Sequence, residues 1–139
     1  MSTYFKALKN DEIAELLDKC KLGYLGTIGI SQPYITPIAF AYKNETLYFN
    51  TLDGTKKVEN IKSNPQVCFL VLESKPGLRG TKQVAIFGEA ERLKADEDIA
   101  TARKVQLEKY RLEREGKVPP FNIVHYKIEA KKIVGKLIV

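Results

Sequence analysis

The chain has 139 residues, 44% of them hydrophobic, and carries a formal net charge of +6. This length suits one domain, residues 1–139, that can bury a single core. No stretch approaches the ~20 apolar residues of a membrane span and no export segment is recognisable, so we expect a soluble cytoplasmic protein without a membrane partner. The positive charge favours an anionic ligand, which could be nucleic acid, acidic lipid or a phosphorylated cofactor.

The first part of the chain alternates turn residues with short apolar segments. Asn10-Asp11-Glu12, followed by an apolar stripe at helical spacing, predicts a helix that ends near Cys20. Lys43-Asn44-Glu45 is a tight hairpin connection. Branched and aromatic residues around it predict three strands, at residues 22–30, 34–42 and 46–51.

In the remainder of the chain, turn residues again separate short predicted elements. After the turn Leu52-Asp53-Gly54, a short helix capped by Thr55 or Asp53 is predicted to run to Ser63. A loop is expected at 74–80 and a bulge or a close backbone approach at Gly88. Further strands are predicted at residues 66–72, 82–93, 123–130 and 132–139, with a helix at 95–115 and a loop at 116–120. Six or seven short strands with few helices indicate a small barrel.

Acid and base residues four apart mark one face of the last predicted helix. Lys104 precedes Glu108, and Lys109 precedes Glu113. Residues at this spacing are neighbours on a helix surface. We therefore expect this face, Lys109 included, to be exposed to solvent.

The sequence gives little support for a catalytic or metal site built from side chains alone. His125 lies within a strand pattern and no nucleophile motif accompanies it, so it is a poor candidate for a catalytic base. Cys20 and Cys68 lie far apart in apolar segments, and we expect two buried, reduced thiols and no metal site. The catalytic residue is therefore unknown, and a bound cofactor is expected to supply any reaction.

The informative segment runs from Tyr48 to Pro65. A strand ends on Thr51, a glycine turn follows, and Thr55, Lys56 and Lys57 open a helix. Backbone amides, hydroxyls and ammonium groups can then converge on one anion such as a phosphate. An ordinary capped helix with a solvated basic face explains the same residues about equally well, so both interpretations stay open on the residues alone.

A resemblance to a known family favours the phosphate. Without a gap, the segment resembles the phosphate-binding strand and helix of the pyridoxamine 5'-phosphate oxidase-like family, the FMN-binding split barrels. Asn64-Pro65 resembles the helix end, and Gln83 the glutamine that contacts the flavin. Residues 33–40 resemble the strand whose main chain runs along the isoalloxazine ring, in the form typical of the short nitroimidazole-reductase-like branch.

The resemblance implies a mainly β (α+β) split barrel of six or seven strands with peripheral helices, binding FMN. It implies a homodimer with the flavin at the interface, and transfer of hydride or electrons from a reduced nicotinamide to a small-molecule acceptor. The residues implied to hold the cofactor are Pro37, Ile38, Ala39, Phe40, Asn50, Thr51, Thr55, Lys56, Lys57 and Gln83. Ile38 and Phe40 are expected to place their side chains in the core whether or not a flavin binds.

Departures from the family pattern limit what can be carried over. Thr36 stands where the oxidase has an arginine and Ala41 where it has a lysine, so oxidation of pyridoxamine phosphate itself is not expected. Other members of the wider family use a deazaflavin or bind haem, and a flavin carrier without turnover is a further alternative. Nucleic acid is not expected as a partner, because basic and aromatic residues are not interleaved as in a stacking platform.

Overall fold

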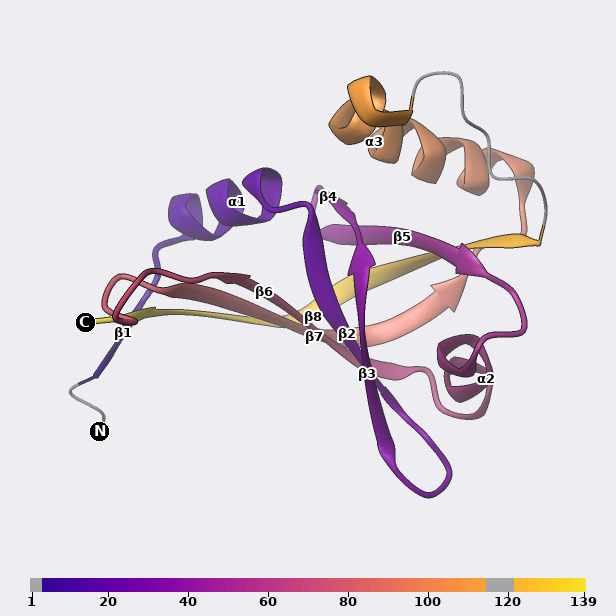
Figure 1. Cartoon of the computed structure of the whole chain (residues 1–139). Coiled ribbons are helices and arrows are strands. Elements are labelled where there is room, and N and C mark those ends of the chain that lie inside the picture. The colour runs from indigo at the N-terminus through magenta and orange to yellow at the C-terminus, as the bar shows by residue number, and fades with distance from the viewer. Residues whose placement is uncertain (1–3, 115–121) are drawn as a thin grey trace.

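The computed structural model describes residues 4–114 and 122–139 (Figure 1). Within these residues the helices are α1 (Asn10–Lys19), α2 (Lys56–Ser63) and α3 (Asp96–Arg114). The strands are β1 (Phe5–Ala7), β2 (Leu22–Ile28), β3 (Pro33–Ala39), β4 (Ala41–Lys43), β5 (Thr46–Leu52), β6 (Gln66–Glu73), β7 (Lys82–Arg92) and β8 (Ile123–Ile138).

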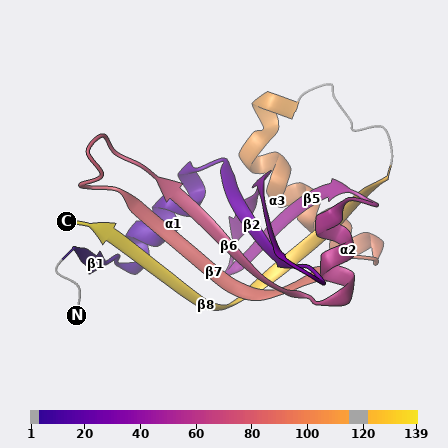
Figure 2. The ribbon, with the colours of Figure 1, turned by 60° about the horizontal axis from the view of Figure 1, so that its bottom comes forward.

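All described strands belong to one antiparallel sheet. Its order is β3-β2-β6-β7-β8-β5-β4, and β1 pairs with β8. The end strands of this order, β3 and β4, are consecutive in the chain, and only Phe40 separates them. The sheet therefore curls until its two ends meet at Phe40, as Figures 1 and 2 show. The predicted mainly β split barrel with peripheral helices is confirmed.

Alternate residues of the strands fill the barrel. Leu47 and Phe49 of β5 are fully buried, and the Phe49 ring stacks on Tyr126 of β8 with centroids 5.1 Å apart. On the other side Phe40 meets Phe69 edge to face, also at 5.1 Å. Burying one such side chain contributes about 1.5–3 kcal/mol, so this interior supplies most of the driving force for folding.

The helices cover the ends and one side of the barrel. α1 and α2 lie toward opposite ends in both ribbon views, and α3 packs against β4, β5 and β8 (Figures 1 and 2). Buried Val58 and Ile61 attach α2, and the Asn60 side chain donates a 3.0 Å hydrogen bond to Thr27 of β2. None of the described helices has both the length and the apolarity needed to cross a membrane.

Two predicted local features are confirmed. Asn44 and Glu45 both have positive φ, 53° and 61°, and form a two-residue connection between paired β4 and β5. This conformation matches the right-handed twist of the strands. At Gly88 the register of β7 on β8 shifts, and a Cβ there would lie 2.6 Å from the carbonyl oxygen of Glu129. Only glycine fits this close approach.

Three strand predictions were wrong in extent. The strand predicted at 34–42 divides at Phe40, because β3 pairs with β2 whereas β4 pairs with β5. The strands predicted at 123–130 and 132–139 form a single strand, β8, because both parts pair with β7 across the bulge. β1 escaped prediction, since three residues are too few to show a period. The loop predicted at 116–120 lies outside the described residues.

α3 is held to the barrel by two consecutive side chains. The Tyr110 hydroxyl accepts the N–H of Phe40 (3.1 Å), donates to the carbonyl of Lys21 (2.8 Å), and also contacts the Phe40 carbonyl. The Lys109 ammonium donates to the carbonyls of Leu17 and Cys20 and lies 3.9 Å from the centre of the Phe40 ring. The prediction that Lys109 faces solvent was wrong, because these carbonyls at the end of α1 attract it inward.

Candidate functional site

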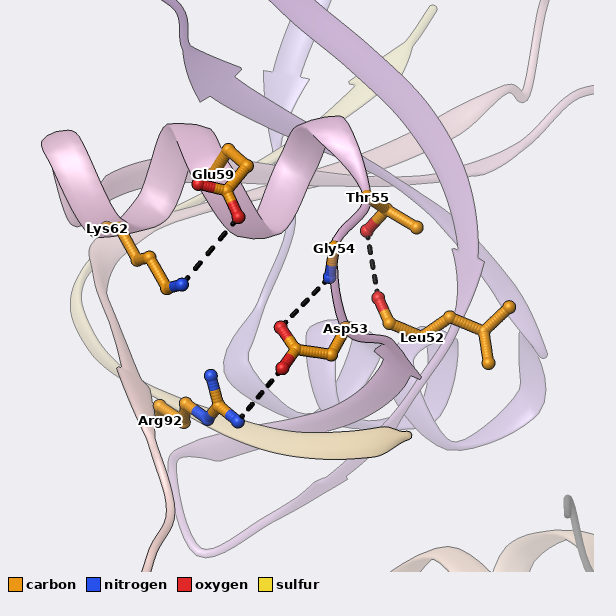
Figure 3. Close-up of polar contacts among 7 residues, drawn as sticks. All are labelled: Leu52, Asp53, Gly54, Thr55, Glu59, Lys62 and Arg92. Carbon is orange, nitrogen blue, oxygen red and sulfur yellow. Dashed lines mark hydrogen bonds and ion pairs between the residues drawn. The ribbon is translucent and has the colours of Figure 1, made fainter. Parts of the chain in front are cut away.

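The turn between β5 and α2 forms the centre of the candidate site (Figure 3). Gly54 has φ 80°, and its N–H donates to the carboxylate of Asp53 at 2.9 Å. Thr55 occupies the position before the helix, yet its hydroxyl donates to the carbonyl of Leu52 at 3.0 Å. Thr55 is the N-cap residue, as predicted, but its side chain makes no capping hydrogen bond to α2. The first amides of α2 are thus left to solvent or to a ligand.

Lys56 and Lys57 are the first two residues of α2. The Lys56 ammonium lies 5.5 Å from the centre of the Tyr34 ring on β3. Consecutive residues of a helix point about 100° apart, so Lys57 leaves the helix in another direction. Lys57 is half-buried, and burial lowers the pKa of its ammonium. A partly desolvated ammonium gains most when an anion comes to lie beside it.

β3 carries the predicted ring-binding residues, and its Tyr34 is the residue that Lys56 contacts. The side chains of Pro37 and Ala39 point outward, whereas Ile38 and Phe40 are buried, as predicted for the core. β3 is an end strand, with β2 as its only partner among the described strands, so its other edge has backbone groups available to a ligand. The N–H and C=O of Phe40 are instead engaged by Tyr110.

The two predicted residues at the end of β5 face opposite sides of the sheet. The Asn50 side chain donates a 3.0 Å hydrogen bond to Gln106 of α3, which is buried. Thr51, half-buried, follows in the same strand and therefore points to the barrel side. The structure thus places Asn50 beneath α3 and does not bring it together with Lys56.

Gln83 lies apart from the other predicted residues. It pairs with Leu72 of β6, and the ladders through β6 and β2 bring that position level with Ala39 of β3. Three strand spacings, about 14 Å, separate it from β3, and Tyr34 lies five residues, about 17 Å, further along that strand. Gln83 and Lys56 of one chain are therefore too far apart to hold the same phosphate.

An apolar hollow adjoins Tyr34 on the outer face of the sheet. It has a volume of about 480 Å³ and is lined by Gly26, Thr27, Ile28, Pro33, Tyr34, Ile35, Gln66, Val67, Cys68 and Phe87. Sequence reasoning weighed Tyr34 only as a proton donor and missed the rest. A signal was nevertheless present in the sequence. In β2 and β6 the residues of both faces are largely apolar, which is typical of strands that are covered on both sides.

Other candidates stay apart from this region. His125 lies opposite Asn50 in the β5–β8 ladder, and Arg79 is exposed in the loop after β6. Cys20 and Cys68 form no disulfide and are half-buried, and burial raises the pKa of both thiols. Among the described residues no group of three histidine, cysteine or carboxylate side chains could hold a metal ion.

Solved structures with similar folds cover nearly the whole chain. An FAD-binding protein from Mesorhizobium loti is 25% identical, with a TM-score of 0.77 over 95% of this chain and 96% of that one. A candidate 5-nitroimidazole antibiotic resistance protein from Bacteroides thetaiotaomicron is 18% identical (TM-score 0.78, 95% and 87% covered). The haem storage protein HutZ from Vibrio cholerae is 16% identical (TM-score 0.77, 91% and 94% covered).

The sequence itself gives the family. No curated protein matches the chain. The profile described as pyridoxamine 5'-phosphate oxidase matches residues 10–134, which include both the β5–α2 turn and the strands β3 and β7. With this match over most of its length and the split barrel described above, the chain belongs to the pyridoxamine 5'-phosphate oxidase family.

Proposed function

We propose that the chain binds FMN, with the phosphate at the start of α2 and the isoalloxazine ring along β3, and acts as a flavin-dependent oxidoreductase. The contact of Lys56 with Tyr34 is the observation that carries this proposal. It brings the cationic helix start against β3, the predicted ring-binding strand, at Tyr34, a residue that also borders the apolar hollow. A phosphate at the helix start and an aromatic ring along β3 can therefore belong to one extended ligand.

The residues present fit an FMN phosphate. The first turn of α2 offers amides without a side-chain cap, and Lys56 and Lys57 offer two ammonium groups. Hydrogen bonds to charged groups contribute about 1.5–3 kcal/mol each, and a helix terminus adds about 0.3–1 kcal/mol. Micromolar affinity needs about 8 kcal/mol, so the ring must contribute too. The apolar hollow and the open edge of β3 supply a surface for it.

The bound flavin would supply the redox chemistry, passing electrons or hydride from a reduced nicotinamide to a small acceptor. The protein's residues bind and orient it: the lysines hold the phosphate and the backbone of Pro37 to Ala39 lies along the ring. We assign no general acid or base. Ala41 is buried in the place of the oxidase's lysine, so recognition of pyridoxamine phosphate is not part of the proposal.

We also propose a homodimer that packs through the outer face of β2, β3, β6 and β7. Exposed apolar side chains there include Leu22, Tyr24, Ile28, Ile35, Leu72 and Phe87. Gln83 belongs to this face, so a second copy packed here would bring its own Gln83 close to the first copy's β3. Sedimentation should give a dimer for the native chain and a monomer for Phe87→Glu. A native monomer would contradict the assembly.

Haem is a weaker candidate than flavin. Haem iron in proteins is held by an axial histidine, cysteine, methionine or tyrosine. His125, the chain's one histidine, lies opposite Asn50 on β8, away from the apolar hollow, whose Cys68 and Tyr34 are of the residue types that can bind haem iron. The start of α2, with two lysines and no side-chain cap, favours a phosphorylated cofactor over haem. A deazaflavin would place a ring and a phosphate on the same residues as FMN.

The visible spectrum of the purified protein tests the proposal. Flavin absorption bands should be present, or should develop with altered shape when FMN is added, and the flavin should be released on denaturation. A protein that stays colourless and ignores FMN would contradict the cofactor. Oxidation of a reduced nicotinamide, followed with a quinone or a nitroaromatic acceptor, separates an oxidoreductase from a flavin carrier without turnover.

A further inference from the structure

A second hollow lies at the other end of α2. It has a volume of about 480 Å³, within the range of small-molecule sites, and is lined by Ile61, Lys62, Ala90, Arg92, Lys94 and Tyr126. Three of these residues carry a positive charge. The other three are buried: Tyr126 is 1% exposed, Ala90 5% and Ile61 6%. The hollow therefore combines an apolar floor with a cationic rim.

Backbone contacts bring two of these cations, Arg92 and Lys62, to the same place. Arg92 lies directly opposite Tyr126 in the β7–β8 ladder, so both side chains leave the sheet on the same face. The N–H of Ala90 donates to the carbonyl of Pro65 at 2.8 Å, which holds the end of α2 over β7. In Figure 3 the side chains of Lys62 and Arg92 extend from α2 and from the sheet toward the same space.

The charges at the rim are only partly compensated. Arg92 pairs with Asp53 at 3.4 Å and Lys62 with Glu59 at 3.6 Å. Both pairs are long and solvent-exposed, and exposed pairs of this kind contribute at most about 1 kcal/mol. Lys94 has no ion pair with any residue in the described ranges 4–114 and 122–139. An incoming anion can therefore displace both carboxylates at little cost.

We propose that this hollow, which we call the α2–β7 pocket, binds a small phosphorylated molecule whose apolar body rests on Ile61, Ala90 and Tyr126. The phosphate would lie between Arg92 and Lys94, with Lys62 closing the third side. An arginine fork beside a lysine is a favourable partner for a phosphate dianion. Burial raises the pKa of the Tyr126 hydroxyl, which keeps its proton available for donation.

The α2–β7 pocket adjoins the turn of the proposed flavin site through the Arg92–Asp53 pair, but it contains neither of that site's lysines. Lys62 follows Lys56 by six residues, which places it about 9 Å further along the helix and on another face. Lys56 points toward β3, whereas the pocket is built on β7 and β8. The inference thus stands whether or not the chain binds FMN.

Titration with phenyl phosphate tests the pocket. The host is Lys56→Ala·Lys57→Ala, which lacks the ammonium groups of the proposed flavin site. Adding Arg92→Gln·Lys94→Gln should weaken binding by at least about tenfold, since two charge-assisted contacts are lost. The matched control Arg103→Gln·Lys104→Gln removes one arginine and one lysine from α3 and should change affinity less than about twofold.

Equal weakening by both pairs of substitutions, or no binding of millimolar phenyl phosphate, would overturn the proposal. Amide chemical shifts of the native protein provide a second measurement that needs no variant. Phenyl phosphate should shift the signals of Ile61 and Ala90 more than that of Thr55. Shifts confined to Thr55 and Lys56 would place the ligand at the flavin site and contradict the α2–β7 pocket.

Discussion

Lys109 and Lys56 each lie over an aromatic ring, and they differ in what else they contact. Lys109 of α3 lies over Phe40, and its ammonium donates to two carbonyls at the end of α1. Lys56 of α2 lies over Tyr34, is exposed, and has no hydrogen bond or ion pair with any described residue. The ammonium of Lys109 is hydrogen-bonded within the fold, whereas the ammonium of Lys56 can still donate hydrogen bonds to a ligand.

The same contrast extends to the neighbouring residues. Beside Lys109, the Tyr110 hydroxyl bonds the backbone at the junction of β3 and β4. Beside Lys56, the half-buried Lys57 has a pKa lowered by burial. A basic residue whose donors are bonded to main-chain carbonyls supports the structure, and one held near an exposed ring without such partners is suited to a ligand. Substitutions in the two regions should therefore affect different properties.

The largest effect is expected for Lys56→Ala·Lys57→Ala. Loss of both ammonium groups should weaken FMN binding at least about thirtyfold, or about 2 kcal/mol. Thermal stability should hardly change, because neither lysine forms a hydrogen bond or an ion pair with another described residue. Arg103→Ala·Lys104→Ala, two consecutive cations of α3, is the control, and fluorescence quenching of FMN gives the affinity. An affinity within about threefold of the native value would show that the phosphate lies elsewhere.

A smaller effect, in stability, is expected for Tyr110→Phe. The substitution removes the hydroxyl that bonds both the Phe40 N–H and the Lys21 carbonyl and leaves these groups their long mutual hydrogen bond of 3.4 Å. The loss of a hydrogen bond of this kind costs about 0.5–1.5 kcal/mol. Urea unfolding measures this loss. Tyr24→Phe, which removes an exposed hydroxyl from β2, should cost less than about 0.5 kcal/mol. Equal stability of the two variants would mean that Tyr110 does not fasten α3.

A further effect is a dependence of stability on pH that originates at Lys109. Burial lowers the pKa of its ammonium from 10.5 to about 8. Between these two pH values the unfolded chain binds the proton more tightly than the folded chain, so the free energy of unfolding rises as the pH rises. Below about pH 8 both states hold the proton, and the gain in stability is absent. The native protein should therefore gain stability relative to Lys109→Met between pH 7.5 and pH 9.5. A difference independent of pH would contradict the assignment.

Much of this architecture could be predicted from the sequence because its signals are local. The helix from Asn10, the turn at Asn44-Glu45 and the irregularity at Gly88 each depend on a few neighbouring residues. The division at Phe40 could not be predicted, since a continuous apolar run does not reveal where a strand changes its pairing partner. Lys109 was misassigned because a favourable acid four residues later hides an inward orientation.

The site shows the same limit. The ungapped sequence around Thr55, Lys56 and Lys57 was enough to suggest an anion site. The contact between Lys56 and Tyr34 joins residues of two elements and depends on how α2 docks on β2 through Asn60. The α2–β7 pocket likewise needs the β7–β8 register. Long-range contacts of this kind leave no trace in the spacing of residues.

The position of β8 in the sheet has a consequence for how the chain folds. Three hairpins, β2–β3, β4–β5 and β6–β7, join strands that are neighbours in sequence and can form early. β8 alone connects the third hairpin to the second, and it also pairs with β1 from the start of the described chain. Closing such distant contacts costs loop entropy before they become stabilising, so we expect slow folding, on the order of milliseconds to seconds, limited by the pairing of β8.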